Sequence, residues 1–227
     1  MEEINLIIAA MDSEVEAILE TVKDYEETTL YKYKAYKFNR NGEDYYLVTG
    51  EIGKVATAIK ITALSLNYKI KRVFNLGTSG SVSKDVTIDT VIIATKVGYH
   101  DVDVQAFNYK LGQIPGGDPE LYECDNEWIE KHLSNVTYPY LRGVVRSGDQ
   151  FITKENYPST NLPKFDDVLT CEMESGAVGQ TCFTLKIPFV VIRSISDSVL
   201  VDDNKTTHDE HVASSMKASA LVLLQMI

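Results

Sequence analysis

The chain opens with an apolar run at residues 4–10, interrupted only by Asn5, that leads directly into an amphipathic segment. An almost continuous apolar run is typical of a strand covered on both faces. In the next segment Ser13 and Glu16 have the spacing of a capping box, and apolar residues from Val15 to Val22 recur at helical intervals. A buried strand followed at once by a helix predicts an α/β domain.

The same alternation continues to the end of the chain. Further strands are expected at residues 72–76, 90–97, 142–147, 169–173 and 189–195, and further helices at residues 53–66, 175–185 and 209–226. Residues 31–38 and 45–49 flank Asn41-Gly42, a pair typical of a tight hairpin turn. We therefore expect residues 1–227 to form a single domain, a three-layer α/β/α sandwich around a mixed, mostly parallel, twisted sheet.

The overall charge and the cysteines limit the possible partners and compartments. A net charge of −11 argues against a nucleic-acid partner, which calls for clustered Lys and Arg. The acidic N-terminus and short first apolar run argue against an export signal or a membrane span. Three cysteines without a CxxC pair are a poor disulfide framework, so we expect a reducing cytoplasm.

Residues 171–197 are the most informative segment for function. The segment begins with Cys171-Glu172-Met173-Glu174-Ser175 and ends with Arg193-Ser194-Ile195-Ser196-Asp197. It therefore places ionisable and hydroxyl side chains at strand ends, where ligands bind in α/β folds. Carboxyls with apolar neighbours have raised pKa values, as a general acid working near neutral pH requires.

Other motif-like strings indicate less. Residues 50–55 lack the glycine spacing of a phosphate-binding P-loop, and residues 77–81 lack the Gly-x-Ser-x-Gly pattern of serine hydrolases. The glycines at 77–81 would allow close backbone approach to a ligand, or simply form a flexible turn. The His-containing strings 100–103 and 208–211 lack the further ligands of a metal site, so we expect polar surface clusters and no metal or cofactor.

Six blocks occur in a distinctive order over nearly the whole chain. They are Ala10-Met11-Asp12-Ser13-Glu14-Val15, Gly53-Lys54, Gly77-Thr78-Ser79-Gly80, Ser147-Gly148-Asp149-Gln150-Phe151-Ile152, Glu172-Met173-Glu174 and Arg193-Ser194-Ile195-Ser196-Asp197. In this order they resemble the 5'-methylthioadenosine/S-adenosylhomocysteine nucleosidases of the nucleoside phosphorylase superfamily. One departure is Gly77-Thr78-Ser79-Gly80-Ser81, where that family usually has Gly-Ser-Ala-Gly-Gly.

The resemblance implies cleavage of a purine N-glycosidic bond through an oxocarbenium-like state. Such a reaction needs an acid for the leaving base and a base that activates water on the opposite face of the sugar. By resemblance, Asp197, held by Ser196, is the general acid to adenine N7, and Glu14 activates water. Arg193 and Thr78 would orient that water.

The resemblance also implies a substrate-binding set. Glu174 would hold the ribose hydroxyls, Met173 would pack against the sugar, Phe151 would stack on adenine, and the Ile152 backbone would read the base edge. The set is completed by Ser79, Gly80 and Glu172. An apolar wall for the 5' group would consist of Met11 and Val104, and of Phe107, Tyr109 and Pro115 from a neighbouring subunit. A shared wall implies a homodimer.

Each of these residues also has a structural explanation. Met173 and Phe151 could be core residues, Glu14 could be a first-turn helix acid, and Ser196-Asp197 could cap the following segment. The joint pattern, rather than any single residue, favours a site.

Water rather than phosphate is the expected nucleophile. A phosphorylase must hold a phosphate dianion with converging cations, yet the first 39 residues contain no Arg. We therefore expect hydrolysis of 5'-methylthioadenosine and S-adenosylhomocysteine, with 5'-deoxyadenosine as a further substrate, serving methionine salvage and removal of a methyl-cycle by-product. The alternatives are a purine nucleoside phosphorylase, an aminodeoxyfutalosine nucleosidase, and a noncatalytic nucleoside-binding or storage protein.

Overall fold

The predicted first strand and helix are present in the computed structural model, which describes residues 1–227, as β1 (Glu3–Ala9) and α1 (Asp12–Val22). The helix begins before Ser13, so the predicted Ser13–Glu16 capping box is wrong. Instead the Glu14 carboxylate accepts the backbone N–H groups of Ala10 and Met11, at 2.9 and 3.2 Å. A side chain in the first turn reaches back to free N–H groups that no earlier turn can satisfy.

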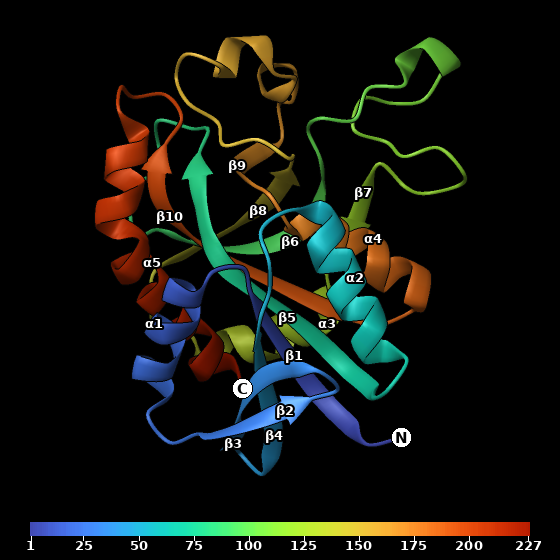
Figure 1. Ribbon diagram of the computed structural model, residues 1–227. Coiled ribbons are helices and arrows are strands. Elements are labelled where there is room, and N and C mark those ends of the chain that lie inside the picture. The colour runs from blue at the N-terminus through green and yellow to red at the C-terminus, as the bar shows by residue number, and fades with distance from the viewer.

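All strands belong to one mixed sheet (Figure 1). The remaining strands are β2 (Glu26–Leu30), β3 (Tyr33–Arg40), β4 (Glu43–Thr49), β5 (Lys69–Ser81), β6 (Val91–Tyr99), β7 (Leu121–Glu123), β8 (Tyr140–Ser147), β9 (Val168–Glu172) and β10 (Phe189–Ser198). Their order is β10-β6-β8-β9-β5-β1-β4-β3-β2, with β7 beside β6. Because β10 also pairs with β5, strands β5, β10, β6, β8 and β9 close into a ring.

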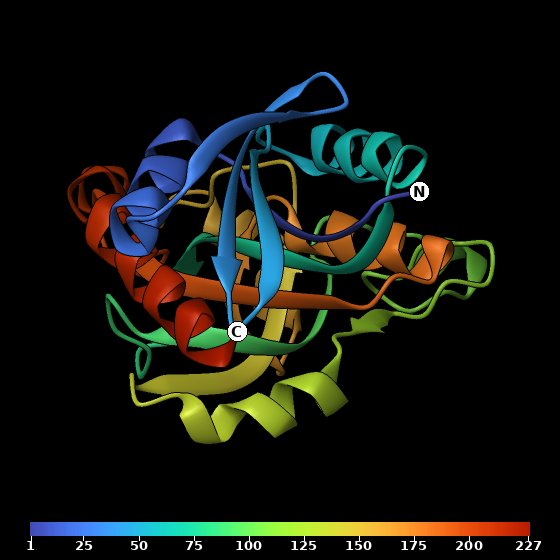
Figure 2. The same ribbon diagram turned by 90° about the horizontal axis from the view of Figure 1, so that it is seen from below.

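Helices cover the sheet on two sides, which confirms the expected α/β class. They are α2 (Lys54–Ser65), α3 (Asn126–His132), α4 (Ser175–Leu185) and α5 (Asn204–Met226). Helix α1 packs on α5, and α2 packs on α4, on the opposite side of the strands (Figures 1 and 2). No helix has the length and apolar character needed to cross a membrane.

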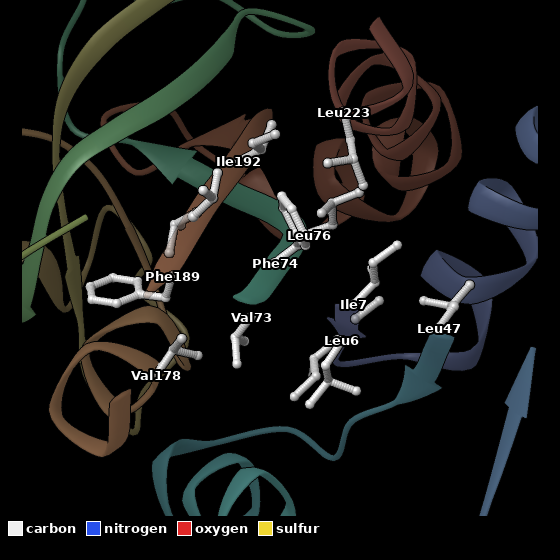
Figure 3. Packing of buried hydrophobic residues seen from close by; sticks show 14 of the residues in the cluster. Leu6, Ile7, Leu47, Val73, Phe74, Leu76, Val178, Phe189, Ile192 and Leu223 are labelled. Atoms are coloured by element: carbon white, nitrogen blue, oxygen red, sulfur yellow. The ribbon is translucent and has the colours of Figure 1, made fainter. Parts of the chain in front are cut away.

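Strand β5 runs through the centre of the hydrophobic core. Figure 3 shows its Val73, Phe74 and Leu76 between residues of β1 and β10, with Val178 of α4 and Leu223 of α5 on the two helical sides. These side chains are fully buried or nearly so. A core packed from both sides holds β5 and β10 rigidly where they leave the apolar interior.

The predicted hairpin turn is present, whereas the predicted end of the β5 strand is wrong. Asn41 and Gly42 have φ values of 49° and 82°, so the predicted hairpin turn between β3 and β4 is confirmed. In contrast, residues 77–81 are not a loop, because β5 continues through them to Ser81. They form strand because β10 pairs alongside and β9 pairs at Gly80 and Ser81. Glycine-rich backbone stays extended here because neighbouring strands supply its hydrogen bonds.

Candidate active site

A cavity of about 420 Å³ lies where β1, β5, β8, β9 and β10 end. Thirteen predicted site residues line it, namely Met11, Glu14, Thr78, Ser79, Gly80, Phe151, Ile152, Glu172, Met173, Glu174, Arg193, Ser196 and Asp197. Ala10, Ile52, Gln150, Cys171, Lys205, His208 and Asp209 also line it and were not predicted as site residues. The volume is within the range of small-molecule sites.

Glu14 is buried and lines the cavity. Its Oε2 accepts the N–H groups of Ala10 and Met11, and its Oε1 accepts the N–H and hydroxyl of Thr78, at 2.9 and 3.2 Å. All four contacts are donated to Glu14, which suits an ionised carboxylate, since this form only accepts hydrogen bonds. The arrangement provides a held anion that can take a proton from water.

Asp197 is also buried and lines the same cavity, and it meets different hydrogen-bond donors. Ser196 Oγ donates to its Oδ1 at 2.9 Å, and Asn204 Nδ2 donates to its Oδ2 at 2.7 Å. The same Asn204 amide donates to the Ile152 carbonyl at 2.9 Å, so it ties Asp197 to the predicted adenine-reading backbone. Ser196 and Asp197 lie inside β10, so the alternative in which they cap the following segment is wrong.

Strand β5 relates the positions of the two carboxyls. Thr78 contacts Glu14, and Gly80, two residues further along the strand, is the register partner of Asp197. Two residues of strand span roughly 7 Å. Inverting glycoside hydrolases, in which water attacks opposite the leaving group, separate their carboxyls by about 6.5–9.5 Å. The two β5 residues that meet Glu14 and Asp197 are thus separated by a distance of the same order.

Arg193 is buried and contacts Thr78, the residue that also contacts Glu14. Its Nη2 contacts Asn75 Oδ1 at 2.5 Å and Glu172 Oε2 at 2.6 Å, Nε donates to Ser175 Oγ at 3.2 Å, and Nη1 donates to the Thr78 carbonyl at 3.3 Å. A guanidinium has five N–H groups, so these contacts leave one Nη1–H for the cavity. Arg193 is thus held rigidly, with one donor available to a water.

Glu172, the last residue of β9, and Glu174, which follows the strand, differ in their surroundings. The Glu172 oxygens accept the Ser147 hydroxyl and the N–H groups of Glu174 and Ser175, besides the ion pair with Arg193. Glu172 therefore anchors other residues and has little capacity left for a ligand. Burial, and then the charge of Glu172, raises the pKa of Glu174 to about 8. Glu174 also accepts the Gly53 N–H at 3.0 Å, and it lines the cavity.

The predicted base and sugar contacts face the same cavity. Phe151 is 40% exposed and lines the cavity, so the alternative that makes it a core residue is wrong. Met173 is partly exposed there as well. The Ser79 hydroxyl is buried without a hydrogen-bond partner, which leaves it available to a ligand. Together these groups form an apolar slot with polar ends.

The predicted 5' wall is only partly assembled. Met11 lines the cavity, but Val104, Phe107, Tyr109 and Pro115 do not. Val104 was expected from this subunit, and its segment runs outside the cavity. Phe107, with 75% of its surface exposed, and its two neighbours were expected to act on a partner's site, which one chain does not contain.

Two residues at the start of α5, Asn204 and His208, contribute to the site without having been predicted from the sequence. The helix begins at Asn204, five residues before its predicted start at Asp209. His208 was expected in a polar surface cluster, but it lines the cavity, with Nδ1 3.0 Å from Ser196 Oγ. The surrounding residues Lys205, Thr206 and Asp209 are polar, as in a solvated helix end, so no local signal marks the contact.

Three comparisons place the chain among known proteins. A relative from Staphylococcus carnosus (strain TM300), named 5'-methylthioadenosine/S-adenosylhomocysteine nucleosidase, is 34% identical over 224 residues, or 97% of each protein. A nucleosidase of that name from Colwellia psychrerythraea 34H, solved in complex with adenine, aligns with a TM-score of 0.89 at 28% identity, covering 100% of this chain and 95% of that one. Futalosine hydrolase of Helicobacter pylori strain 26695 aligns with a TM-score of 0.87 at 28% identity, covering 99% and 97%.

The family model described as the phosphorylase superfamily matches residues 6–227, which is nearly the whole chain. The match includes every strand end that lines the cavity, and the first relative named above covers the same span. The chain therefore belongs to the phosphorylase superfamily and, within it, to the 5'-methylthioadenosine/S-adenosylhomocysteine nucleosidase family of N-glycosyl hydrolases.

Proposed function

We propose that this enzyme hydrolyses the N-glycosidic bond of 5'-methylthioadenosine and S-adenosylhomocysteine, releasing adenine and the 5-substituted ribose. The observation that carries the proposal is the pair of buried carboxyls, Glu14 and Asp197, that line one cavity. The names of the relatives and the adenine in a similar structure support it. The reaction would serve methionine salvage and removal of a methyl-cycle by-product.

Asp197 is the general acid in this proposal. It donates a proton to adenine N7 as the glycosidic bond breaks, which makes the base a better leaving group. The Ser196 hydroxyl and the Asn204 amide, at 2.9 and 2.7 Å, then stabilise the carboxylate that forms. Hydrogen bonds to a charged group are stronger than neutral ones, so this support grows as the proton leaves.

Glu14 is the general base, and its surroundings favour water over phosphate. The carboxylate takes a proton from water on the face of the sugar opposite the base. Thr78, and the N–H of Arg193 that has no protein partner, help to orient that water. Arg193 and Lys205 are the only Arg or Lys residues that line the cavity, and Arg193 is already paired with Glu172. A phosphate dianion beside Glu14 would be repelled without compensating cations.

The remaining roles follow the shape of the cavity. Phe151 stacks on adenine, and the Ile152 backbone reads the base edge. Glu174 binds the ribose hydroxyls, and its raised pKa reflects burial and the nearby charge of Glu172, a cost that hydrogen bonds from such hydroxyls would reduce. Met173 packs against the sugar, and Met11 lies at the 5' end.

Adenine release from 5'-methylthioadenosine should proceed at the same rate with and without inorganic phosphate. The expected sugar product is free 5-methylthioribose rather than its 1-phosphate, because water is the nucleophile. Phosphate-free buffer, a phosphate titration and product analysis measure this directly. An absolute phosphate requirement would contradict hydrolysis.

A futalosine-type nucleoside is the second candidate substrate, favoured by the similarity to the Helicobacter pylori futalosine hydrolase. Product analysis across 5'-methylthioadenosine, S-adenosylhomocysteine, 5'-deoxyadenosine and aminodeoxyfutalosine separates the two candidates. We expect the first two to be cleaved with the highest kcat/KM. Faster cleavage of aminodeoxyfutalosine would assign the enzyme to the second candidate.

We also propose that the enzyme is a homodimer through the α2–α4 side. Exposed apolar side chains gather there, including Val55 and Ile59 of α2 and Phe183 of α4, and a groove between these helices extends to Val102 and Ile114. A monomer rarely leaves so large an apolar face uncovered. In the proposed dimer, the exposed Phe107 segment of each copy would complete the 5' wall of the other copy's site. Sedimentation should show dimers, and active monomers alone would contradict the proposal.

A cytoplasmic location remains a prediction. Cys124, Cys171 and Cys182 are free and buried, and burial raises the pKa of each thiol. Protonated, buried thiols are unreactive and need no oxidising compartment.

A further inference from the structure

His208 reaches the general acid through one hydroxyl group. Its Nδ1 lies 3.0 Å from Ser196 Oγ, and Ser196 Oγ lies 2.9 Å from Asp197 Oδ1. The direct distance from Nδ1 to Oδ1 is 3.7 Å. The three side chains therefore form a continuous chain from α5 to the carboxyl that faces the cavity.

The protonation of His208 decides where the Ser196 proton points. Ser196 has one hydroxyl proton and two acceptors within reach besides the ring, Asp197 Oδ1 at 2.9 Å and the Ser79 carbonyl at 3.5 Å. If Nδ1 carries a proton, it donates to Ser196 Oγ, and the hydroxyl proton is free to bind Asp197. If Nδ1 is bare, it competes for that same proton and Asp197 loses a donor.

The surroundings of the ring favour its protonated form. Its interaction with Asp197 raises the pKa of His208, the charges of Asp209 and Glu14 add to this, and burial opposes it. Asp197 faces the ring from β10 and Glu14 from α1, while Asp209 and Lys205 lie on its own helix. The side chain is 20% exposed, so it can exchange protons with solvent.

His208 also borders the predicted adenine slot. Its ring meets the Phe151 ring edge to face, with centroids 5.7 Å apart. Both rings line the cavity. A change at position 208 can therefore be separated into two parts, lost packing against Phe151 and lost hydrogen bonding to Ser196.

We propose that His208 is a positioning residue for the general acid, whose Nδ1–H holds the Ser196 hydroxyl on Asp197 and whose charge stabilises the carboxylate that forms when Asp197 protonates adenine. The proposal rests on the proposed function, because it assumes that Asp197 is the acid. Groups preorganised around a developing charge lower the barrier without reorganising during the reaction. The rate should then depend on a titration at position 208 as well as on the two carboxyls.

The test compares two substitutions with a control on the same helix. In His208→Phe the ring packing is kept and the donor is lost, so kcat should fall by roughly 10-fold or more with little change in KM, the size of one hydrogen bond to a charge. The fall in activity at alkaline pH that comes from His208 should also disappear. In His208→Asn an amide N–H occupies the place of Nδ1, so kcat should partly recover without that pH dependence. His211→Asn, one turn further on, should resemble the wild type.

Two outcomes would overturn the proposal. One is a wild-type kcat and pH profile in His208→Phe; the other is a loss of kcat in which the shape of the pH profile is unchanged, since that indicates packing alone. A binding measurement with adenine and a thermal melt establish that the variants are folded.

A readout independent of turnover separates this proposal from the proposed function. NMR titration of the His208 ring in the Asp197→Asn variant should show a pKa lower than in the wild type, because the partner charge is gone. An unchanged His208 pKa would show that the ring is not coupled to Asp197. If instead the wild type releases no adenine while the coupling is present, the proposed function fails and the contact between the two residues stands.

Discussion

Replacing Asp197 by Asn should lower adenine release by at least about 10²-fold, the low end for loss of a general acid. The side chain keeps its size, and its carbonyl can still accept a hydrogen bond from Ser196 or Asn204. It has no acidic proton, however, so adenine must leave without full protonation at N7. Nucleoside binding should be nearly intact, because the proposed stacking of adenine on Phe151 and the proposed contacts of the Ile152 backbone are unchanged. Steady-state kinetics and a binding titration measure the two effects separately.

The matched control for this variant is Asp202→Asn. Asp202 follows Asp197 closely in sequence, but it is exposed on the surface and pairs with Lys154 at 2.8 Å. The turnover of Asp202→Asn should match that of the wild type, which would show that the loss of a nearby negative charge does not by itself lower turnover. Unchanged turnover in Asp197→Asn would remove Asp197 from the mechanism, and another group would have to protonate the leaving base.

Replacing Glu14 by Gln should also lower turnover, by about 10²- to 10⁴-fold, because an amide cannot take a proton from water. The substitution has a structural cost as well. Every contact of Glu14 is donated to it, by the N–H groups of Ala10 and Met11 on one oxygen and by Thr78 on the other. Whichever way the Gln amide turns, its NH₂ group faces an N–H donor, so the melting temperature should fall.

Glu16→Gln is the control, since Glu16 lies two residues along the same helix and is exposed. It should change neither turnover nor the melting temperature. Affinity for adenine should persist in Glu14→Gln, since in the proposed mechanism Glu14 activates water and does not contact the base. If Glu14→Gln stays folded and hydrolyses its substrate at the wild-type rate, another group activates the water.

The local elements of the fold could be predicted, because their signals are local. The apolar run of β1, the periodic pattern of α1 and the Asn41-Gly42 turn each depend on a few adjacent residues, and each is present in the structure. The closing of the sheet could not be predicted in this way. It requires β10 to pair with both β5 and β6, and nothing within β10 shows that both of its edges are used.

The glycine-rich string shows how tertiary contacts changed an interpretation. As sequence it indicated either a ligand-binding loop or a flexible turn, but it is the end of β5. The glycines are explained by the site side chains that lie next to them. A Cβ at Gly77 would lie 1.9 Å from Arg193 Nη1, and one at Gly80 would lie 3.2 Å from Asp197 Oδ2. The missing side chains make room for two site residues that are more than a hundred positions away.

By itself, the sequence determined the strand and helix alternation, the negative charge and, through six ordered blocks, the candidate acid and base. Only the tertiary structure decided what surrounds each carboxyl. Glu14 receives Thr78 from a strand 64 positions away, and Asp197 is held by Ser196, Asn204 and, through Ser196, His208. A carboxyl's affinity for its proton depends on burial, neighbouring charges and hydrogen-bond donors. Those neighbours come from distant segments, so chemically equivalent side chains acquire different roles only when the chain is folded.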